Sequence, residues 1–490
     1  MTIAEKYWFV GAFLVYFIAA WFSVGHYHDD EYYQILDFAA YKLGFQMQNS
    51  LMWEHESAVR SGLQPFIAFI VAKLSMFANV TSPFIWAFYL RLLTLIVSFL
   101  ALFAFFKVIK EENSVDRYFP WVLFFLLFSW IQIFVNIRFS SEGWSSSLFL
   151  LSYAIYFSNQ SSYVKKYFFV GLFMGLAFLF RFQTGFLILG LGLWIIFHRK
   201  ETIREYIILS LGFMCAILLG LIVDYWFYEK FTISFLNYFS WHIIDGSIDH
   251  IVEPWWFYTY YSMVQLVPPI TFLVPFTILI FWFLFPRHPI TWITIPFILF
   301  HHYFGHKEMR YLFPILPFIP IIFSMAIIKL INYFEFLKKN MFENFLKFLL
   351  CISFLLNIPL VFLTMSLPAS KEVALWQNCF SEHMPDNSIL LVYDPDNSGS
   401  STGELELDFY NQRNIPILSV KDETEISKKL IEFPDRKLFY ASRKKGRASM
   451  LVINEIKSEL VCQALPDWLL KININNWTSR ASIWQIWGIK

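Results

Sequence analysis

Charged residues are scarce in this chain of 490 amino acids, because Asp, Glu, Lys and Arg together make up only 15% of it. A soluble domain has about 25% charged residues, so the composition excludes an ordinary soluble protein. Hydrophobic residues make up 57% of the chain, and its mean hydropathy is +0.51. The composition therefore predicts an integral membrane protein.

Cysteine is equally scarce. The four cysteines are Cys215, Cys351, Cys379 and Cys462, and no CxxC motif or Cys/His pair is present, which argues against a metal site built on them. The first two lie in apolar segments and are expected to pack there. The last two share the polar C-terminal region and would form a disulfide if that region faces an oxidising compartment. Their spacing alone does not decide the matter.

Three further features are missing. The net charge is only +1, and aromatic residues do not alternate with Lys and Arg, so nothing indicates a nucleic-acid partner. The first apolar segment, 7–24, lacks a small-residue cleavage site, and we expect it to remain as a signal anchor. The chain shows no internal repeat and no low-complexity tract.

Apolar segments of about the length needed to span a bilayer occur throughout the first 366 residues. We predict eleven or twelve transmembrane helices, since 63–79 contains Pro65 and Lys73 and is the segment most prone to be irregular. The segments are 7–24, 63–79, 84–106, 119–137, 143–158, 166–180, 184–198, 205–228, 268–285, 290–304, 311–330 and 344–366.

Two kinds of polar stretch separate these segments. Short stretches rich in Lys and Arg are expected on the cytoplasmic side. Longer stretches, 25–61 and 229–267, are rich in acids and aromatics and are expected on the outer side. Residues 367–490 belong there too, as a small mixed α/β domain with strands near 388–394 and 436–442 and a helix at 423–433. We expect residues 1–366 to form the membrane domain.

The first outer stretch contains His28-Asp29-Asp30-Glu31-Tyr32-Tyr33-Gln34, with three consecutive acids. Residues 31–43 carry apolar side chains on one helical face, which predicts a helix lying in the outer membrane interface. Asp29 or Asp30 could serve as the N-cap of that helix. An N-cap needs only one acid, however, so capping does not explain why three acids occur together.

Further charged residues lie near helix ends on the same predicted side. His306, Lys307, Glu308 and Arg310 interrupt an apolar hairpin, either as a polar turn or as a site for a phosphate, which Arg and Lys bind well. Arg138 and Arg181 could snorkel or cap helices, or they could join such a site. Intramembrane charges are costly and mark functional sites by default.

Two motifs resemble a known family. HDDEYYQ after the first apolar segment and HKEMRYLFPILP late in the chain are similar to motifs of GT-C glycosyltransferases that use lipid-phosphate sugars. The closest resemblance is to the α-mannosyltransferases that build GPI anchors and N-glycan precursors from dolichyl-phosphate mannose. Asp29 stands where the family commonly has Pro, and Glu229 replaces a Gly. RFSSEGW, FLFRFQTG, VDYWFYEKF and EPWWFYTYY are weaker similarities in the same order, and the resemblance covers about residues 8–400.

The resemblance implies a GT-C-like fold and an inverting transfer of a hexose, by default mannose, from a polyprenyl or dolichyl phosphate to a glycan or lipid-linked acceptor. It implies Asp30 as general base, with Glu31 orienting it. The leaving phosphate needs cations, and no metal or other cofactor is expected. The substrate-binding candidates are His306, Lys307, Glu308, Arg310, Tyr311, Arg138, Glu142, Arg181, Gln34 and His28.

Two other classes remain open at this point. A transporter or flippase of a lipid-linked sugar would place paired charges at mid-helix and would show internal repeats, whereas here the charges gather near one predicted face. A scaffolding membrane protein would not need acids and cations on the same side. The sequence identifies neither the sugar nor the acceptor, and it is compatible with a bacterial inner membrane or with the endoplasmic reticulum.

Overall fold

The computed structural model describes residues 2–47, 51–111, 118–158, 163–244, 252–334, 340–380, 383–394, 400–443, 458–479, 481 and 483–489. The chain divides into two compact units. The first unit comprises residues 1–20, 53–67 and 90–365, and the second comprises 21–52, 68–89 and 366–490. The polar C-terminal region is thus joined in its unit by two stretches from the first quarter of the chain.

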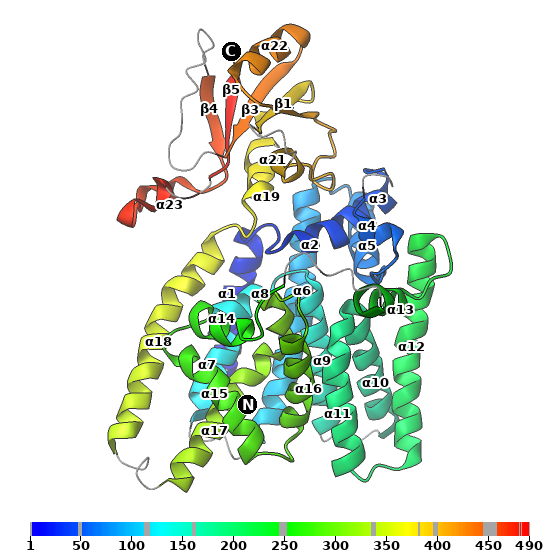
Figure 1. Ribbon diagram of the computed structural model, residues 1–490, viewed down its shortest axis with the longest axis vertical. Helices are drawn as coiled ribbons and strands as arrows, with labels where there is room; N and C mark the ends of the chain where they lie inside the picture. The colour runs from blue at the N-terminus through cyan, green and yellow to red at the C-terminus, as the bar shows by residue number, and fades with distance from the viewer. Residues whose placement is uncertain are drawn as a thin grey trace. The chain divides into compact units, whose positions relative to one another are not determined.

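The first unit is a bundle of helices (Figure 1). All twelve apolar segments picked out in the sequence coincide with a helix or with two consecutive helices. Their bounds, with η denoting 3-10 and π helices, are α1 Ile3–Phe22, α5 Leu63–Phe77, α6 Pro83–Lys110, α7 Phe119–Phe128, α8 Trp130–Asn136, α9 Ser141–Phe157, α10 Tyr163–Phe180, η4 Phe182–Thr184, α11 Gly185–His198, α12 Ile203–Tyr228, η6 Ile270–Leu273, α15 Val274–Leu284, α16 Pro289–Tyr303, η7 Met309–Phe318, α17 Ile319–Tyr333 and α18 Asn340–Ser366. The shorter connections include α4 Trp53–Glu56, α13 Ser234–Phe239, η5 Ser240–Ile244 and α14 Phe257–Gln265.

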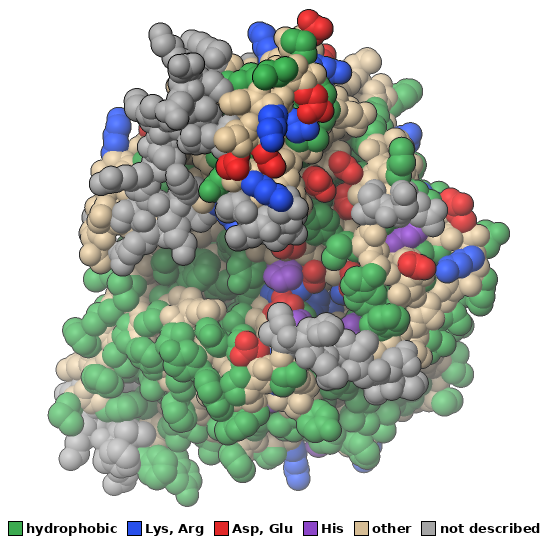
Figure 2. Space-filling model, turned by 45° about the horizontal axis from the view of Figure 1, so that its top comes forward, with side chains coloured by type: hydrophobic (Ala, Val, Ile, Leu, Met, Phe, Trp, Pro, Cys, Tyr) green, Lys and Arg blue, Asp and Glu red, His purple; other side chains and the backbone are tan. Residues whose placement is uncertain are grey.

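Within the described residues, six helices are long and apolar enough to cross a membrane, or seven if the bent pair α7–α8 is one span. This is fewer than the predicted eleven or twelve, because several expected segments, such as α5 and α16, form helices of only 15 residues. Hydrophobic side chains cover most of the helical surface on the face shown in Figure 2. Large exposed side chains such as Leu211, Leu218 and Ile222 of α12 are typical of a lipid-facing helix.

Close packing of α10 against α12 depends on small residues. A Cβ atom at Gly171 would lie 1.9 Å from the Leu209 carbonyl oxygen, and one at Gly212 would lie 2.1 Å from the Phe168 carbonyl oxygen. Membrane helices have little hydrophobic force between them, so small residues that let backbones approach are the usual solution. These two glycines set the distance between the two helices.

The second unit contains a five-stranded sheet of order β2-β1-β3-β5-β4. Strand β1 is parallel to β2 and β3, while β5 is antiparallel to β3 and β4. The strands and helix expected in this region are confirmed. The elements are α2 Asp29–Glu31, η1 Tyr32–Leu36, α3 Asp37–Leu43, α19 Lys371–Leu375, η9 Trp376–Phe380, β1 Ser388–Tyr393, α21 Ser400–Gly403, β2 Ile417–Val420, α22 Glu423–Glu432, β3 Lys437–Ser442, β4 Ser458–Gln463, α23 Asp467–Lys471, η10 Ile474–Ser479 and β5 Gln485–Ile489.

The helical segment 29–43 is part of this unit's core. Its buried Tyr32 and Ala40 belong to one apolar cluster with Trp376, Phe409 and Trp484. The prediction that its apolar face lies in the membrane interface is therefore wrong. Aromatic and aliphatic side chains from the C-terminal residues cover that face instead.

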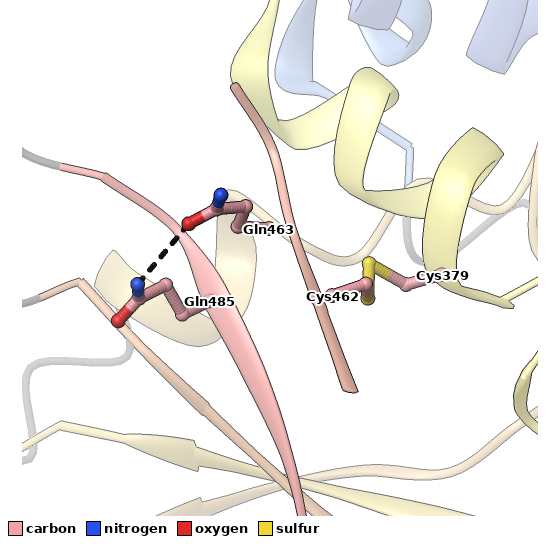
Figure 3. Close-up of a disulfide and its surroundings, with 4 residues drawn as sticks. All are labelled: Cys379, Cys462, Gln463 and Gln485. Atoms are coloured by element: carbon pink, nitrogen blue, oxygen red, sulfur yellow. Dashed lines mark hydrogen bonds between the residues drawn. A yellow bond between two sulfur atoms is a disulfide. The ribbon is translucent and has the colours of Figure 1, made fainter. Parts of the chain in front are cut away.

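Cys379 of η9 and Cys462 of β4 form a disulfide (Figure 3). It ties a helical segment that follows α19 to the edge strand of the sheet. Next to it, the Gln485 side chain donates to the Gln463 side chain at 3.4 Å. The other two cysteines, Cys215 and Cys351, are free thiols exposed on the first unit.

Candidate functional site

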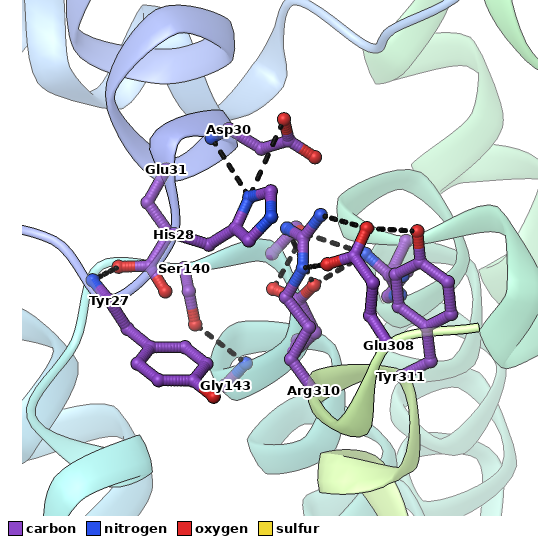
Figure 4. A network of polar contacts seen from close by, with 12 residues as sticks. Tyr27, His28, Asp30, Glu31, Ser140, Gly143, Glu308, Arg310 and Tyr311 are labelled. Atoms are coloured by element: carbon purple, nitrogen blue, oxygen red, sulfur yellow. Dashed lines mark hydrogen bonds and ion pairs between the residues drawn. The ribbon is translucent and has the colours of Figure 1, made fainter. Parts of the chain in front are cut away.

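Glu308 is the centre of a polar network in the first unit (Figure 4). Its carboxylate accepts hydrogen bonds from Arg310 Nε at 2.5 Å and from the Tyr311 hydroxyl at 2.8 Å. His306 Nε2 lies 2.9 Å from the same carboxylate. Four residues of the predicted HKEMRY site are thus brought together around one carboxylate.

Glu142 lies between two arginines. Its Oε1 atom is 2.7 Å from Arg181 Nη1 and 3.2 Å from Arg310 Nη1. All three residues are at least 95% buried, and both guanidinium groups face the Tyr311 ring, at 4.6 Å and 5.4 Å from its centre. We call Glu142, Arg181, Glu308, Arg310 and Tyr311 the arginine cluster. Buried ions of this kind are stable only when each is paired and hydrogen-bonded.

The charged residues of the arginine cluster lie at breaks between helices. Ser140 caps α9 by accepting from the Gly143 N–H at 3.1 Å, which places Glu142 in the first helical turn, where a carboxylate is favoured. Arg181 has an extended backbone between α10 and η4. The 3-10 helix η7, which begins just before Arg310, contains Pro314 and Pro317, which are unsuited to an α-helix interior.

The other predicted cations are placed differently. Lys307 donates to the carbonyl oxygens of Phe304, Glu253 at 3.0 Å and Gly305 at 3.4 Å, and burial lowers the pKa of its amine. Its ammonium therefore holds its own turn together. Arg138 is buried, with its guanidinium 3.8 Å from the centre of the Phe134 ring.

Two donor and acceptor atoms near the cluster are unused within the part of the chain that the structure describes. Arg181 Nε has no hydrogen-bond partner there. His301, which no sequence pattern singled out, donates from Nδ1 to the Phe297 carbonyl at 2.7 Å. Its buried Nε2 is then an acceptor for which no partner is found among the described residues. Its ring centre is 6.2 Å from that of Tyr311. A lone histidine in an apolar helix gives no distinguishing signal in the sequence.

The HDDEYYQ motif lies in the second unit, where a turn at residues 25–28 leads directly into the short helices α2 and η1 (Figure 4). We call residues 25–34 the Asp30 loop. His28, not one of the acids, is the N-cap of α2, since its Nδ1 atom accepts from the Asp30 N–H at 3.2 Å. The Asp29 side chain is 77% exposed and pairs with His26 at 3.6 Å, an interaction that lowers its pKa. The Asp30 side chain is 27% exposed, with Oδ1 3.6 Å from His28 Nδ1.

Glu31 and Gln34 complete the motif. The Glu31 side chain is buried and accepts from the Tyr27 N–H at 3.1 Å, which closes the loop on itself. Gln34 is half-buried on the π helix η1. Among the described residues, no three His, Cys, Asp or Glu side chains come together in a way that could hold a metal ion.

Comparison with known proteins identifies relatives by sequence. The family model of Alg9-like mannosyltransferases matches residues 7–383. GPI mannosyltransferase 3 of Candida albicans is 22% identical over 323 residues, 64% of this chain and 63% of the relative. Alpha-1,2-mannosyltransferase ALG9 of Mus musculus is 29% identical over 207 residues, 38% of this chain and 33% of the relative. The matches therefore span less than two thirds of these relatives' lengths.

The fold is shared with solved structures. ArnT from Cupriavidus metallidurans bound to undecaprenyl phosphate matches with a TM-score of 0.57 and 11% identity, covering 100% of this chain and 98% of that one. Its apo structure matches with a TM-score of 0.53. The similarity in sequence over more than three quarters of the chain, together with this GT-C fold, shows that the protein is a multi-pass membrane protein that belongs to the Alg9-like mannosyltransferase family.

Proposed function

We propose that this protein is a mannosyltransferase that takes mannose from a polyprenyl or dolichyl phosphate and transfers it, with inversion, to a hydroxyl group of a glycan or lipid-linked acceptor. The family supports the sugar, since the named relatives are mannosyltransferases. A fold relative that binds undecaprenyl phosphate supports the class of donor.

One observation in the first unit carries the proposal. An open apolar pocket is lined by Met309, Leu312, Phe313 and Leu316 of η7, together with residues of α14, α15 and α16. The same short helix carries Arg310 and Tyr311 of the arginine cluster. A lipid phosphate needs an apolar channel for its chain next to cations for its head group, and η7 provides residues for both.

The arginine cluster is suited to a leaving phosphate. When the anomeric C–O bond breaks, its electron pair passes to the phosphate oxygen, and fixed donors nearby lower the energy of that charge. Arg181 has an unused Nε–H donor in the described structure. Glu142 and Glu308 keep both guanidinium groups oriented before the donor arrives. His306, half exposed beside Glu308, is the candidate to meet the head group first; a direct phosphate contact by Lys307 or Arg138 remains a prediction.

Asp30 is the proposed general base. Its carboxylate would take the proton of the acceptor hydroxyl as that oxygen attacks the anomeric carbon from the face opposite the phosphate. Its partial exposure suits a group that must meet a substrate. Glu31 holds the loop through Tyr27, and His28 and Gln34 remain candidates for contacts with substrate.

We propose that this chemistry occurs on the extracytoplasmic side. The disulfide between Cys379 and Cys462 supports this assignment, because disulfides persist in oxidising compartments and are rare in the cytosol. The supporting pair belongs to the same unit as Asp30.

The test uses purified protein in nanodiscs with polyprenyl-phosphate mannose and, in parallel, polyprenyl-phosphate glucose. Asp30→Asn should lower the transfer rate by about 10²–10⁴-fold while donor binding is retained. Asp29→Asn is the matched control, because Asp29 is a neighbouring acid whose side chain is mostly exposed. Equal rates for Asp30→Asn and the wild type would refute the base assignment. Net movement of donor across the membrane without transfer would instead support a flippase.

A second variant tests the cations. Arg310→Met should weaken donor binding, measured by titration with polyprenyl phosphate lacking the sugar, because the phosphate loses a guanidinium partner. The control is Arg443→Met, which alters an arginine of the second unit paired with Glu404. Unchanged affinity in Arg310→Met would remove Arg310 from the phosphate site.

A further inference from the structure

The loop that carries Asp30 is anchored at its start by residues from the C-terminal part of the chain. The Val24 carbonyl accepts from the N–H groups of Ala369 at 2.8 Å and Ser370 at 3.2 Å. Gly25 follows with a φ of +88°, and a Cβ atom there would lie 2.5 Å from the Ser370 Cβ. Both its backbone conformation and this close approach require glycine.

The loop is anchored again at its end. The Tyr32 hydroxyl accepts from the Phe409 N–H at 3.0 Å, and the Tyr33 hydroxyl donates to the Gly403 carbonyl at 3.0 Å. The Tyr32 side chain is fully buried, and its ring stacks on that of Tyr410, with centres 6.0 Å apart. Two consecutive tyrosines of the motif thus bind one C-terminal segment.

A π turn makes this double contact possible. The Asp37 N–H donates to the Tyr32 carbonyl, five residues earlier, so the helix is locally wider than an α-helix. Such turns are rare and occur frequently at functional sites. Between the two anchors, the loop is braced internally by the bonds from Asp30 to His28 and from Tyr27 to Glu31.

We propose that residues 403–410 position the loop that carries Asp30. In this proposal Tyr32 and Tyr33 are positioning residues, which act on the reaction through Asp30. The proposal rests on the proposed function, in which Asp30 is the base. A base acts only within hydrogen-bonding reach of its proton, and a shift of about 1 Å can cost about 10²-fold in rate. Asp30 is separated from Tyr32 by a single residue, so a shift of the backbone at Tyr32 would also displace Asp30.

The positioning role makes a specific kinetic prediction. Tyr32→Phe removes the acceptor for the Phe409 N–H, and Tyr33→Phe removes the donor to the Gly403 carbonyl, while each variant retains its ring. We expect kcat for mannosyl transfer to fall by about 10–100-fold in each. KM for the polyprenyl-phosphate donor and the binding of sugar-free polyprenyl phosphate should be unchanged, because the proposed donor groups lie in the first unit.

Tyr89→Phe is the matched control. Tyr89 belongs to the same unit and is 38% exposed, and within the described residues no hydrogen bond is found for its hydroxyl. This variant should keep the wild-type kcat. If Tyr32→Phe fails to fold, Tyr33→Phe tests the positioning role in its place, because Tyr33 is only half-buried.

The outcomes separate the two proposals. If the wild type transfers mannose and both tyrosine variants keep its kcat, the positioning role is wrong and the proposed function stands. A parallel loss of donor binding, unfolding temperature and kcat would show a merely structural role and would also overturn the inference. If the wild type transfers sugar from no polyprenyl phosphate, the proposed function itself fails, and the inference fails with it.

Discussion

Removing the negative charge of Glu142 should destabilise the first unit strongly. In the wild type, two buried guanidinium groups share this carboxylate, and Glu308 supplies the second negative charge. Glu142→Gln keeps the size of the side chain but leaves two cations against one carboxylate. Breaking a buried pair in this way costs about 3–5 kcal/mol. At about 2 °C per kcal/mol for a large unit, the unfolding midpoint should fall by roughly 6–10 °C.

A double-mutant cycle measures how strongly Glu142 and Arg181 depend on each other. Adding Arg181→Met to Glu142→Gln restores the balance, since Arg310 and Glu308 then remain as a neutral pair. The double variant should therefore be more stable than the sum of the single changes predicts, by about 2–3 kcal/mol. Scanning fluorimetry in one detergent, at one lipid content, measures all three variants.

The exposed pair Lys347–Glu343 provides the control, because its atoms are 3.0 Å apart but its lysine is mostly solvent-accessible. Lys347→Met should cost no more than about 0.5 kcal/mol. A Glu142→Gln variant as stable as the wild type would show that the carboxylate does not balance the two buried arginines. A double variant that loses as much stability as the two single variants together would show the same.

Three further predictions concern other parts of the fold. Burial raises the pKa of Asp37 to about 7 from an ordinary 3.8. Because the folded state holds this proton more tightly than the unfolded state, the free energy of unfolding should fall by up to about 4 kcal/mol as pH rises from 3.8 to 7. In chemical denaturation, Asp37→Asn should therefore be more stable than the wild type at pH 8 and equal to it below pH 4. Gly212→Ala should lower the free energy of unfolding by about 1–3 kcal/mol through overpacking. Gly192→Ala is the control and should cost nothing, because no described atom lies within 4 Å of the added Cβ. Equal midpoints for the two variants in thermal unfolding would contradict this. Thiol titration of the unfolded, unreduced protein should find two free cysteines, and four free thiols would exclude the disulfide. The double variant Cys379→Ser, Cys462→Ser should destabilise the second unit by about 4–5 kcal/mol, because the disulfide closes a loop across a separation of 83 residues.

Local features of this chain could be predicted well from its sequence. Each apolar run became helical because a membrane leaves backbone groups no other partner, and the strands near 388–394 and 436–442 follow from their alternating pattern. The ends of the helices were less predictable than their positions: α5 and α16 have only 15 residues each, so they are shorter than the roughly 20 residues of a straight membrane span.

Partners far apart in the chain were not predictable. The sequence pointed to Glu142, Arg181 and Arg310 individually, but nothing in it indicates that one carboxylate serves both arginines. The bend between α7 and α8 was missed for the same reason, since Asn357 of α18 stabilises it by binding the Phe128 carbonyl at 2.7 Å and the Trp130 N–H at 2.9 Å. Likewise, the apolar face of 31–43 gave no sign of whether lipid or protein would cover it.

The anchoring of Tyr32 has a consequence for biosynthesis. The tyrosine is made early, yet the N–H group that binds it lies 377 residues further along the chain. Translation at about 5–20 residues per second therefore leaves the loop of Asp30 without its second anchor for roughly 20–75 seconds. A product that stops between Ser366 and Phe409 would carry the helices of the first unit and the arginine cluster but would lack this support. The proposed transferase activity is thus expected to appear only after the chain has been synthesised past Phe409.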